Sequence, residues 1–156
     1  MSEIDDVGAQ FFLGQAREVG AACMAWRWRD LRTGQASVAY LAFPQCVHSQ
    51  DLLLLPRAIA DVTGLPCVQI DHRVGVVAAE EGLWTAQAMP QAWVKVVSAL
   101  PDESVEGVCE RWAILIRDEY GVEWDTTAVA DALRQLVEMA RRSRGEHHDV
   151  VALWAL

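Results

Sequence analysis

The run "DVVALWAL" at residues 149–156 is almost wholly apolar. A half-buried strand alternates apolar with polar residues, whereas a strand that is buried on both faces is apolar throughout. Two adjacent β-branched valines, Val150 and Val151, add to the preference for an extended conformation. The run therefore predicts a central strand.

Three helices are predicted in the segment before this strand. Pro90 opens the first helix, which extends to about Ser98. The second helix spans residues 102–120 and has Gly121 as its C-terminal cap, and the third begins after Asp125 and ends at Gly145. Apolar residues at helical spacing form one stripe on each of the last two helices. These stripes are Val105, Val108, Trp112, Leu115 and Ile116, and then Val129, Leu133, Leu136 and Ala140.

The N-terminal part predicts a helix followed by a β-hairpin. Residues 3–18 follow Ser2, a candidate N-cap, and have acidic residues where the first turn would lie. Residues 22–43 alternate large apolar with charged side chains around a three-residue loop at 32–34. Trp26 and Trp28 share one face of this hairpin, which we predict to line the core. An exposed recognition surface is the alternative.

The middle of the chain is less regular. Pro56 suits the first turn of a short helix that ends at Gly64, and residues 51–55 fit either a strand or the lead-in to that helix. Residues 67–71 and 74–79 are apolar and rich in β-branched side chains, so they predict two further strands.

Together these segments predict one α+β domain over residues 1–156. We expect an N-terminal helix and a mixed, mostly antiparallel sheet of about five strands that starts with the 22–43 hairpin. Three C-terminal helices pack on one face of the sheet, and the final strand lies at the C-terminus.

Charge and hydropathy restrict the class of partner. The formal net charge is −9, which repels phosphate groups, so we expect no nucleic acid and no membrane partner. No apolar stretch approaches the roughly 20 residues that span a bilayer, and the first residues lack the basic and apolar regions of a secretory signal. We therefore expect a cytoplasmic protein. Its arginines, set against the single lysine Lys95, together with abundant alanine and valine, resemble the usage of a GC-rich bacterial genome.

No local motif identifies an enzyme. Phosphate loops of the GxxxxGK[ST] type, GxGxxG turns, GxSxG, HExxH, EF-hand loops and CxxC pairs do not occur in the sequence. We predict no cofactor, and free buried thiols for the cysteines. The pair of histidines at 147 and 148 is expected to lie in a solvated loop, because adjacent residues of an extended segment point in opposite directions.

One set of soft ligands gives an alternative. If the sheet brings residues 46–48 beside residues 71–72, the set could bind a metal ion. A cysteine of the set, activated by a histidine and oriented by Asp71, could instead act as a nucleophile. The residues of this alternative site are Cys46, His48, Cys67, Asp71 and His72.

The helix at 102–120 and the segment after it predict an acidic surface. Its carboxylates outnumber Arg111 and Arg117, so its field would attract a basic protein. A solvated helix face is the simpler alternative. The candidate partner-binding residues are Glu103, Glu106, Glu110, Asp118, Glu119, Glu123, Trp124 and Asp125. The basic run "RRSR" at 141–144 falls at the end of a predicted helix, where cations offset the helix dipole.

In size and charge the chain resembles small acidic bacterial proteins that neutralise a toxin or chaperone a partner. The favoured hypothesis is a cytoplasmic protein without catalytic activity of its own that binds a basic protein partner, in the manner of an immunity protein, an inhibitor or a chaperone. A small metal- or thiol-dependent enzyme or sensor, using the Cys46 to His72 set, is the alternative. The sequence leaves the oligomeric state open, a dimer included.

Overall fold

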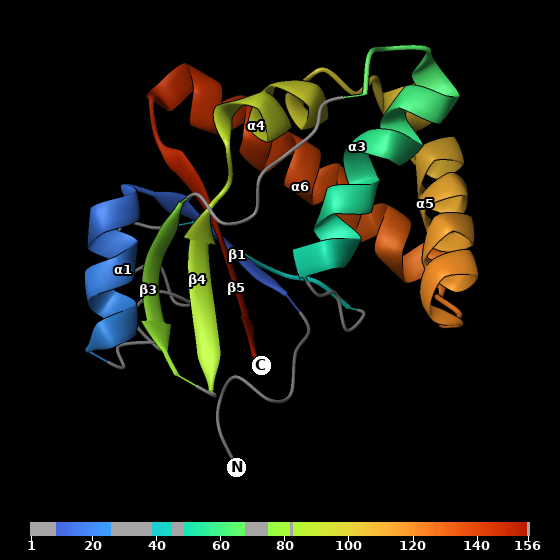
Figure 1. The fold of residues 1–156 in the computed structure, drawn as a ribbon. Coiled ribbons are helices and arrows are strands. Elements are labelled where there is room, and N and C mark those ends of the chain that lie inside the picture. The colour runs from blue at the N-terminus through green and yellow to red at the C-terminus, as the bar shows by residue number, and fades with distance from the viewer. Residues whose placement is uncertain (1–8, 26–38, 45–48, 68–74, 82, 156) are drawn as a thin grey trace.

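The computed structural model describes residues 9–25, 39–44, 49–67, 75–81 and 83–155 (Figure 1). Strands and helices are mixed along the chain, and the last three helices precede the last strand. In chain order the elements are β1 (Gln10–Gly14), α1 (Ala16–Met24), β2 (Ala39–Ala42), α3 (Ser49–Thr63), β3 (Val76–Glu80), β4 (Trp84–Ala88), α4 (Gln91–Ser98), the 3-10 turn η1 (Asp102–Ser104), α5 (Val105–Tyr120), α6 (Thr126–Glu146) and β5 (Asp149–Ala155).

A 5-stranded sheet in the order β2-β1-β5-β4-β3 forms the centre of this single-domain α+β fold. Every pairing among the described strands is antiparallel. The last strand, β5, lies in the middle, where Val151 is opposite Phe12 of β1 and Leu153 is opposite Ala86 of β4. The prediction that the apolar tail is a central strand is therefore confirmed.

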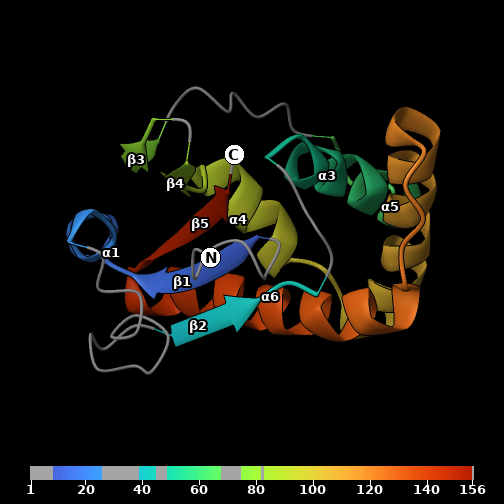
Figure 2. The same ribbon diagram turned by 90° about the horizontal axis from the view of Figure 1, so that it is seen from below.

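The two faces of the sheet are covered by different helices. Successive residues of β5 point to opposite faces, so Val150 and Ala152 pack under the helices α3 to α6. Val151 and Leu153 pack on the other side, together with Val19 of α1. Figure 2 shows α6 running along one side of the strands and α1 lying apart from it at the other side. The sheet thus separates two cores.

The three C-terminal helices are confirmed, and every residue of the two predicted stripes is buried. α4 and α5 both pack on α6, and α5 also packs on α3. The Asp125 side chain accepts hydrogen bonds from the backbone N–H groups of Thr127 and Ala128, at 3.1 and 3.4 Å. Gly121 closes α5 with a left-handed φ of 70°, which glycine adopts without strain. These caps fix where α5 ends and α6 begins.

The last helix ends one residue later than predicted. α6 continues through Gly145 to Glu146, and His147 adopts the left-handed conformation with a φ of 55°. The backbone N–H of His148 then donates to the carbonyl of Ser143 at 3.1 Å, which satisfies a carbonyl at the helix end.

The N-terminal helix predicted over residues 3–18 is also wrong in its bounds. Residues 10–14 form β1, and the helix occupies Ala16–Met24 instead. Phe11, Phe12 and Leu13 are contiguous because β1 is flanked by strands and buried on both faces, not because they belong to a helical stripe. The part of the prediction before residue 9 lies outside the described residues.

The predicted hairpin at 22–43 is contradicted where the structure describes it. Its first strand would include residues 22–24, which are the last turn of α1. Its second strand is present as β2, but β2 pairs with β1, with Tyr40 opposite Phe12, and their rings stack at a centroid distance of 5.4 Å. Trp26, Trp28 and the turn lie outside the described residues, so their place in a core or on a surface stays a prediction.

The middle of the chain differs from its prediction in two respects. α3 begins at Ser49 and has Pro56 in its interior, so residues 51–55 are helical. The strand predicted at 74–79 is confirmed as β3, whereas β4 was not predicted and the strand predicted at 67–71 lies mostly outside the described residues. The sequence of β4, "WTAQA", lacks the run of β-branched residues that indicates a strand.

Candidate functional site

The predicted acidic surface is exposed and lies along α5 and the segment that leads to α6. The stripe of α5 faces inward, and each of the candidate carboxylates is exposed to solvent. The side chain of Trp124 is half-buried and packs against the core. These positions agree with the interpretation as a surface, but a solvated face has the same exposure.

Ion pairs divide these carboxylates into two groups. Glu106 is paired with Arg134 of α6, with 2.9 Å between Oε1 and Nη2, and Asp118 lies 3.7 Å from Nε of its neighbour Arg117. Asp125 is engaged as the N-cap of α6. Within the described part of the chain, Glu103, Glu110, Glu119 and Glu123 have neither an ion pair nor a hydrogen bond through their side chains.

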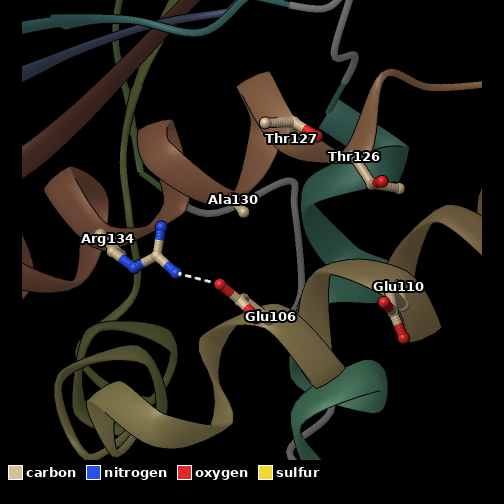
Figure 3. Close-up of a pocket in the computed structure, with 6 residues that line it drawn as sticks. All are labelled: Glu106, Glu110, Thr126, Thr127, Ala130 and Arg134. Atoms are coloured by element: carbon tan, nitrogen blue, oxygen red, sulfur yellow. Dashed lines mark hydrogen bonds and ion pairs between the residues drawn. The ribbon is translucent and has the colours of Figure 1, made fainter.

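A groove with two hollows follows the junction of α5 and α6. The first, the Arg134 hollow, has a volume of about 250 Å³ and is lined by Glu106, Glu110, Thr126, Thr127, Ala130 and Arg134. Figure 3 shows Arg134 reaching from α6 toward Glu106 of α5, with Thr126 and Thr127 on the first turn of α6.

The second hollow, the Trp124 hollow, has a volume of about 330 Å³. It shares Glu110 and Thr126 with the Arg134 hollow, so the two lie side by side. Its other lining residues are Ala113, Ile114, Arg117, Glu123 and Trp124. Aliphatic and aromatic side chains therefore meet two carboxylates and one guanidinium group in one depression, and a mixture of apolar and charged groups is typical of protein interfaces.

The buried ring of Trp112 supports the side chain of Trp124 from the core side. The ring of Trp124 meets Trp112 edge to face, with centroids 4.7 Å apart and planes at 85°. Trp112 is itself fully buried, and its indole N–H donates to the carbonyl of Asp51 at 2.8 Å. A firmly supported aromatic ring at the surface loses little conformational entropy when a ligand packs on it.

Only part of the predicted surface contributes to the groove. Glu106, Glu110, Glu123 and Trp124 line it, whereas Glu103, Asp118, Glu119 and Asp125 do not. The sequence did not indicate Thr126, Thr127, Ala130 or Arg134, because no pattern in it shows which side of α6 faces α5. The 3.6-residue period identifies the buried stripe of each helix but not the partner that it packs against.

The alternative metal or thiol site remains untested in its main part. Cys46, His48, Asp71 and His72 lie outside the described residues, and Cys67 is exposed. Among the residues that the structure describes, no group of histidine, cysteine and carboxylate side chains could hold a metal ion. In the segment 146–149, His148 lies 3.5 Å from Glu146, and Asp149 accepts a hydrogen bond from the first backbone N–H of α1, that of Ala16.

The buried thiols are not suited to nucleophilic chemistry at neutral pH. Burial raises the pKa of the Cys23 thiol to about 12. Burial, with the neighbouring carboxylate of Glu110, raises the pKa of Cys109 to about 11, although Arg134 opposes that shift. Because the thiolate is the reactive form, both are structural thiols, as predicted. Cys67 is free but exposed, which corrects the prediction that it is buried.

The basic run at 141–144 stabilises the fold. Arg141 donates to the carbonyl oxygens of Ser98, the last residue of α4, and of Leu100 just beyond it, at 3.2 and 2.8 Å. Arg144 donates to the hydroxyl of Ser98 at 3.2 Å, and Arg142 pairs with Glu146 at 3.3 Å. Cations at a helix C-terminus satisfy its last carbonyl groups. Arg141 also donates to Asp102 of η1 at 3.3 Å, so the hydrogen bonds of the run are directed to neighbouring elements of the fold.

Within the described residues, none of the helices has the length and apolar character needed to span a membrane. No family model matches the chain, and no curated protein matches it. Among solved structures it is similar to YfbM from Escherichia coli, a protein of unknown function, with 9% identity, coverage of 95% of this chain and 99% of that chain, and a TM-score of 0.44. A similarity at this level carries no inference about activity.

Proposed function

We propose that this chain is an acidic bacterial cytoplasmic protein that binds a basic protein partner through the groove between α5 and α6, and that it acts by occlusion, as an immunity protein, inhibitor or chaperone does. The observation that carries the proposal is the placement around the supported ring of Trp124 of two carboxylates, Glu110 and Glu123, that form no ion pair with any residue the structure describes. Aromatic anchors inside a polar rim supply most of the binding energy of protein interfaces.

Electrostatics supports the choice of a basic partner. The net charge of −9 produces a long-range attraction for cationic surfaces, which raises association rates at low ionic strength. The arginines of the groove, Arg117 and Arg134, already have carboxylate partners within the described residues. A positively charged partner therefore gains contacts at Glu110 and Glu123 without displacing an existing pair.

Site-specific photo-cross-linking in the source bacterium tests the proposal. Replacement of Ile114, a residue that is 37% exposed and lines the Trp124 hollow, by p-benzoylphenylalanine places the reactive group in the groove. The matched control replaces Glu18, an exposed residue of α1 on the other face of the sheet. We expect position 114 to give one discrete adduct with a protein of high isoelectric point, and position 18 to give none. Equal adducts at both positions, or an acidic protein at position 114, would overturn the proposal.

A further inference from the structure

The charges of the groove are balanced except at one place. Glu106 is paired with Arg134, and Arg117 is paired with Asp118. Both arginines that line the groove are thus engaged, whereas Glu110 and Glu123 have no partner in the described part of the chain. The uncompensated charge of the groove is negative and lies at the Trp124 hollow.

The apolar lining of the same hollow consists of Ala113, Ile114 and Trp124. Ile114 has no place in the core and is 37% exposed, although isoleucine is among the residues most often buried. The indole of Trp124 packs edge to face with the fully buried ring of Trp112 and also borders solvent, since Trp124 is only half-buried. The hollow therefore offers an aromatic ring and aliphatic groups beside two carboxylates that have no partner among the described residues, and its one cationic lining residue, Arg117, lies 3.7 Å from the carboxylate of Asp118.

We infer that the Trp124 hollow binds an arginine side chain of the partner, with the guanidinium group between Glu110 and Glu123 and against the indole of Trp124. This inference rests on the proposed function and specifies the chemistry of the contact. A guanidinium group combines a planar face that stacks on an aromatic ring with N–H donors at its edge that match carboxylates. Its aliphatic stem would cover Ile114 and Ala113.

Two alternatives fit the hollow less well. Lysine carries a compact, strongly hydrated charge that neither stacks nor donates in a fork, so it would use only the carboxylates. A small-molecule ligand needs an enclosing pocket of roughly 300–1,000 Å³ that covers most of its surface. The Trp124 hollow, at about 330 Å³, is at the lower limit of that range and suits a single side chain.

Titration with arginine derivatives isolates this contact from the rest of the partner. The probe is N-acetyl-arginine amide, added at low ionic strength to the full-length protein labelled with ¹⁵N, and the signal is the indole N–H cross-peak of Trp124. A Trp124→Phe variant identifies that peak among those of the seven tryptophans. We expect a saturable shift with the arginine probe, a weaker one with N-acetyl-lysine amide, and none with N-acetyl-citrulline amide, which has nearly the same shape but no charge.

The variant Glu110→Gln/Glu123→Gln should raise the Kd for the arginine probe at least about fivefold, because two charge contacts are removed. The variant Glu103→Gln/Glu119→Gln removes the same charge from exposed residues that do not line the groove, so its Kd should stay within about twofold of the parent. Folding of both variants is checked by their thermal unfolding curves.

The absence of a shift at any attainable probe concentration, an equal shift with citrulline, or equal effects of the two variants would overturn the inference. The cross-linking experiment keeps this failure separate from that of the proposed function. An adduct at position 114 together with a failed titration means that a basic partner binds without an arginine in the hollow. Absence of both means that the proposed function is wrong.

Discussion

The carbonyl group of Leu52 in α3 cannot form the usual helical hydrogen bond with the N–H four residues later. The carbonyl of residue 52 would accept from the N–H of residue 56, but Pro56 has no N–H. The indole N–H of Trp93 donates to this carbonyl instead, at 3.2 Å and in a buried position. A proline within a helix is thus accommodated because a side chain of α4 supplies the missing donor.

This arrangement predicts coupling between Trp93 and Pro56. Trp93→Phe leaves the Leu52 carbonyl buried without its donor and should lower the free energy of unfolding by about 1–3 kcal/mol beyond the loss of ring volume. In the background of Pro56→Ala, which provides a backbone N–H, the same substitution should be less harmful by at least about 1 kcal/mol. Denaturant unfolding of the four proteins of this cycle measures the coupling. Strict additivity would contradict the role given to Trp93.

The buried thiols predict a loss of stability at alkaline pH. In the unfolded chain both thiols ionise near 9.0, whereas in the folded protein the pKa of Cys23 is about 12 and that of Cys109 about 11. Above pH 9 the folded state therefore holds more protons than the unfolded state, so the free energy of unfolding falls as pH rises, by up to about 1.4 kcal/mol per pH unit for each thiol. Below that pH the contribution of the thiols is constant.

Urea unfolding at about pH 8 and about pH 10.5 measures this effect. The double variant Cys23→Ala/Cys109→Ala should lose much less stability between the two pH values than the parent. Cys67→Ala is the matched control, because it removes an exposed thiol in place of a buried one. An unchanged pH dependence in the double variant would mean that the thiols are not the cause.

At the scale of single elements, the end of α6 gives a further prediction. Gly145 is helical and nothing lies within 4 Å of a Cβ built on it, so Gly145→Ala should stabilise the protein by about 0.5–1 kcal/mol. His147 is left-handed, so His147→Gly should remove strain and add about 1 kcal/mol. Thermal unfolding of both variants is the measurement. If Gly145→Ala destabilised the protein, the helix would end at Gly145, as the sequence predicts, and not at Glu146.

The elements that could be predicted are those with local signals. The stripes and caps of α5 and α6 involve residues close in the sequence, and the apolar run of β5 is contiguous. Both can therefore be recognised from the sequence. β1 and β4 depend on strands far away in sequence, since β1 pairs with β5 and β2, and β4 with β5 and β3. Contact with these neighbours overrides weak local propensity, which is why the local pattern of "QFFLG" predicts a helix and that of "WTAQA" predicts no element.

In the candidate site, too, features with a local sequence signal could be predicted, whereas features that depend on tertiary contacts could not. The acidic and exposed character of α5 was predictable, because the apolar stripe leaves the opposite side of the helix to solvent. Which of these carboxylates are paired could not be predicted. Arg134, for example, lies 28 positions from Glu106 in the sequence and meets it only through helix packing. Within the described residues Glu103 and Glu119 are unpaired as well, so what distinguishes Glu110 and Glu123 from them is their place in the groove between α5 and α6, which helix packing creates.

At the scale of the whole molecule, the two cores share one strand. Alternate residues of β5 belong to the core under α3 to α6 and to the core under α1. Detachment of either layer would expose one face of the central strand, so the layers should stabilise each other. Among the described residues, Cys109 is a buried thiol of the first core and Cys23 of the second, which makes the stability of each layer measurable.

We therefore expect Cys23 and Cys109 to become reactive with the same free energy of opening, equal to that of global unfolding, because one cooperative domain exposes both cores together. Alkylation of the native protein over a range of subdenaturing urea concentrations, with each cysteine followed by mass spectrometry, measures the two values separately. Exposed Cys67 should react at once and confirms that the reagent is active. A lower opening free energy at Cys23 that does not change with urea would show that α1 detaches locally. The sheet and the helices α3 to α6 would then form one cooperative unit, and α1 would unfold independently of it.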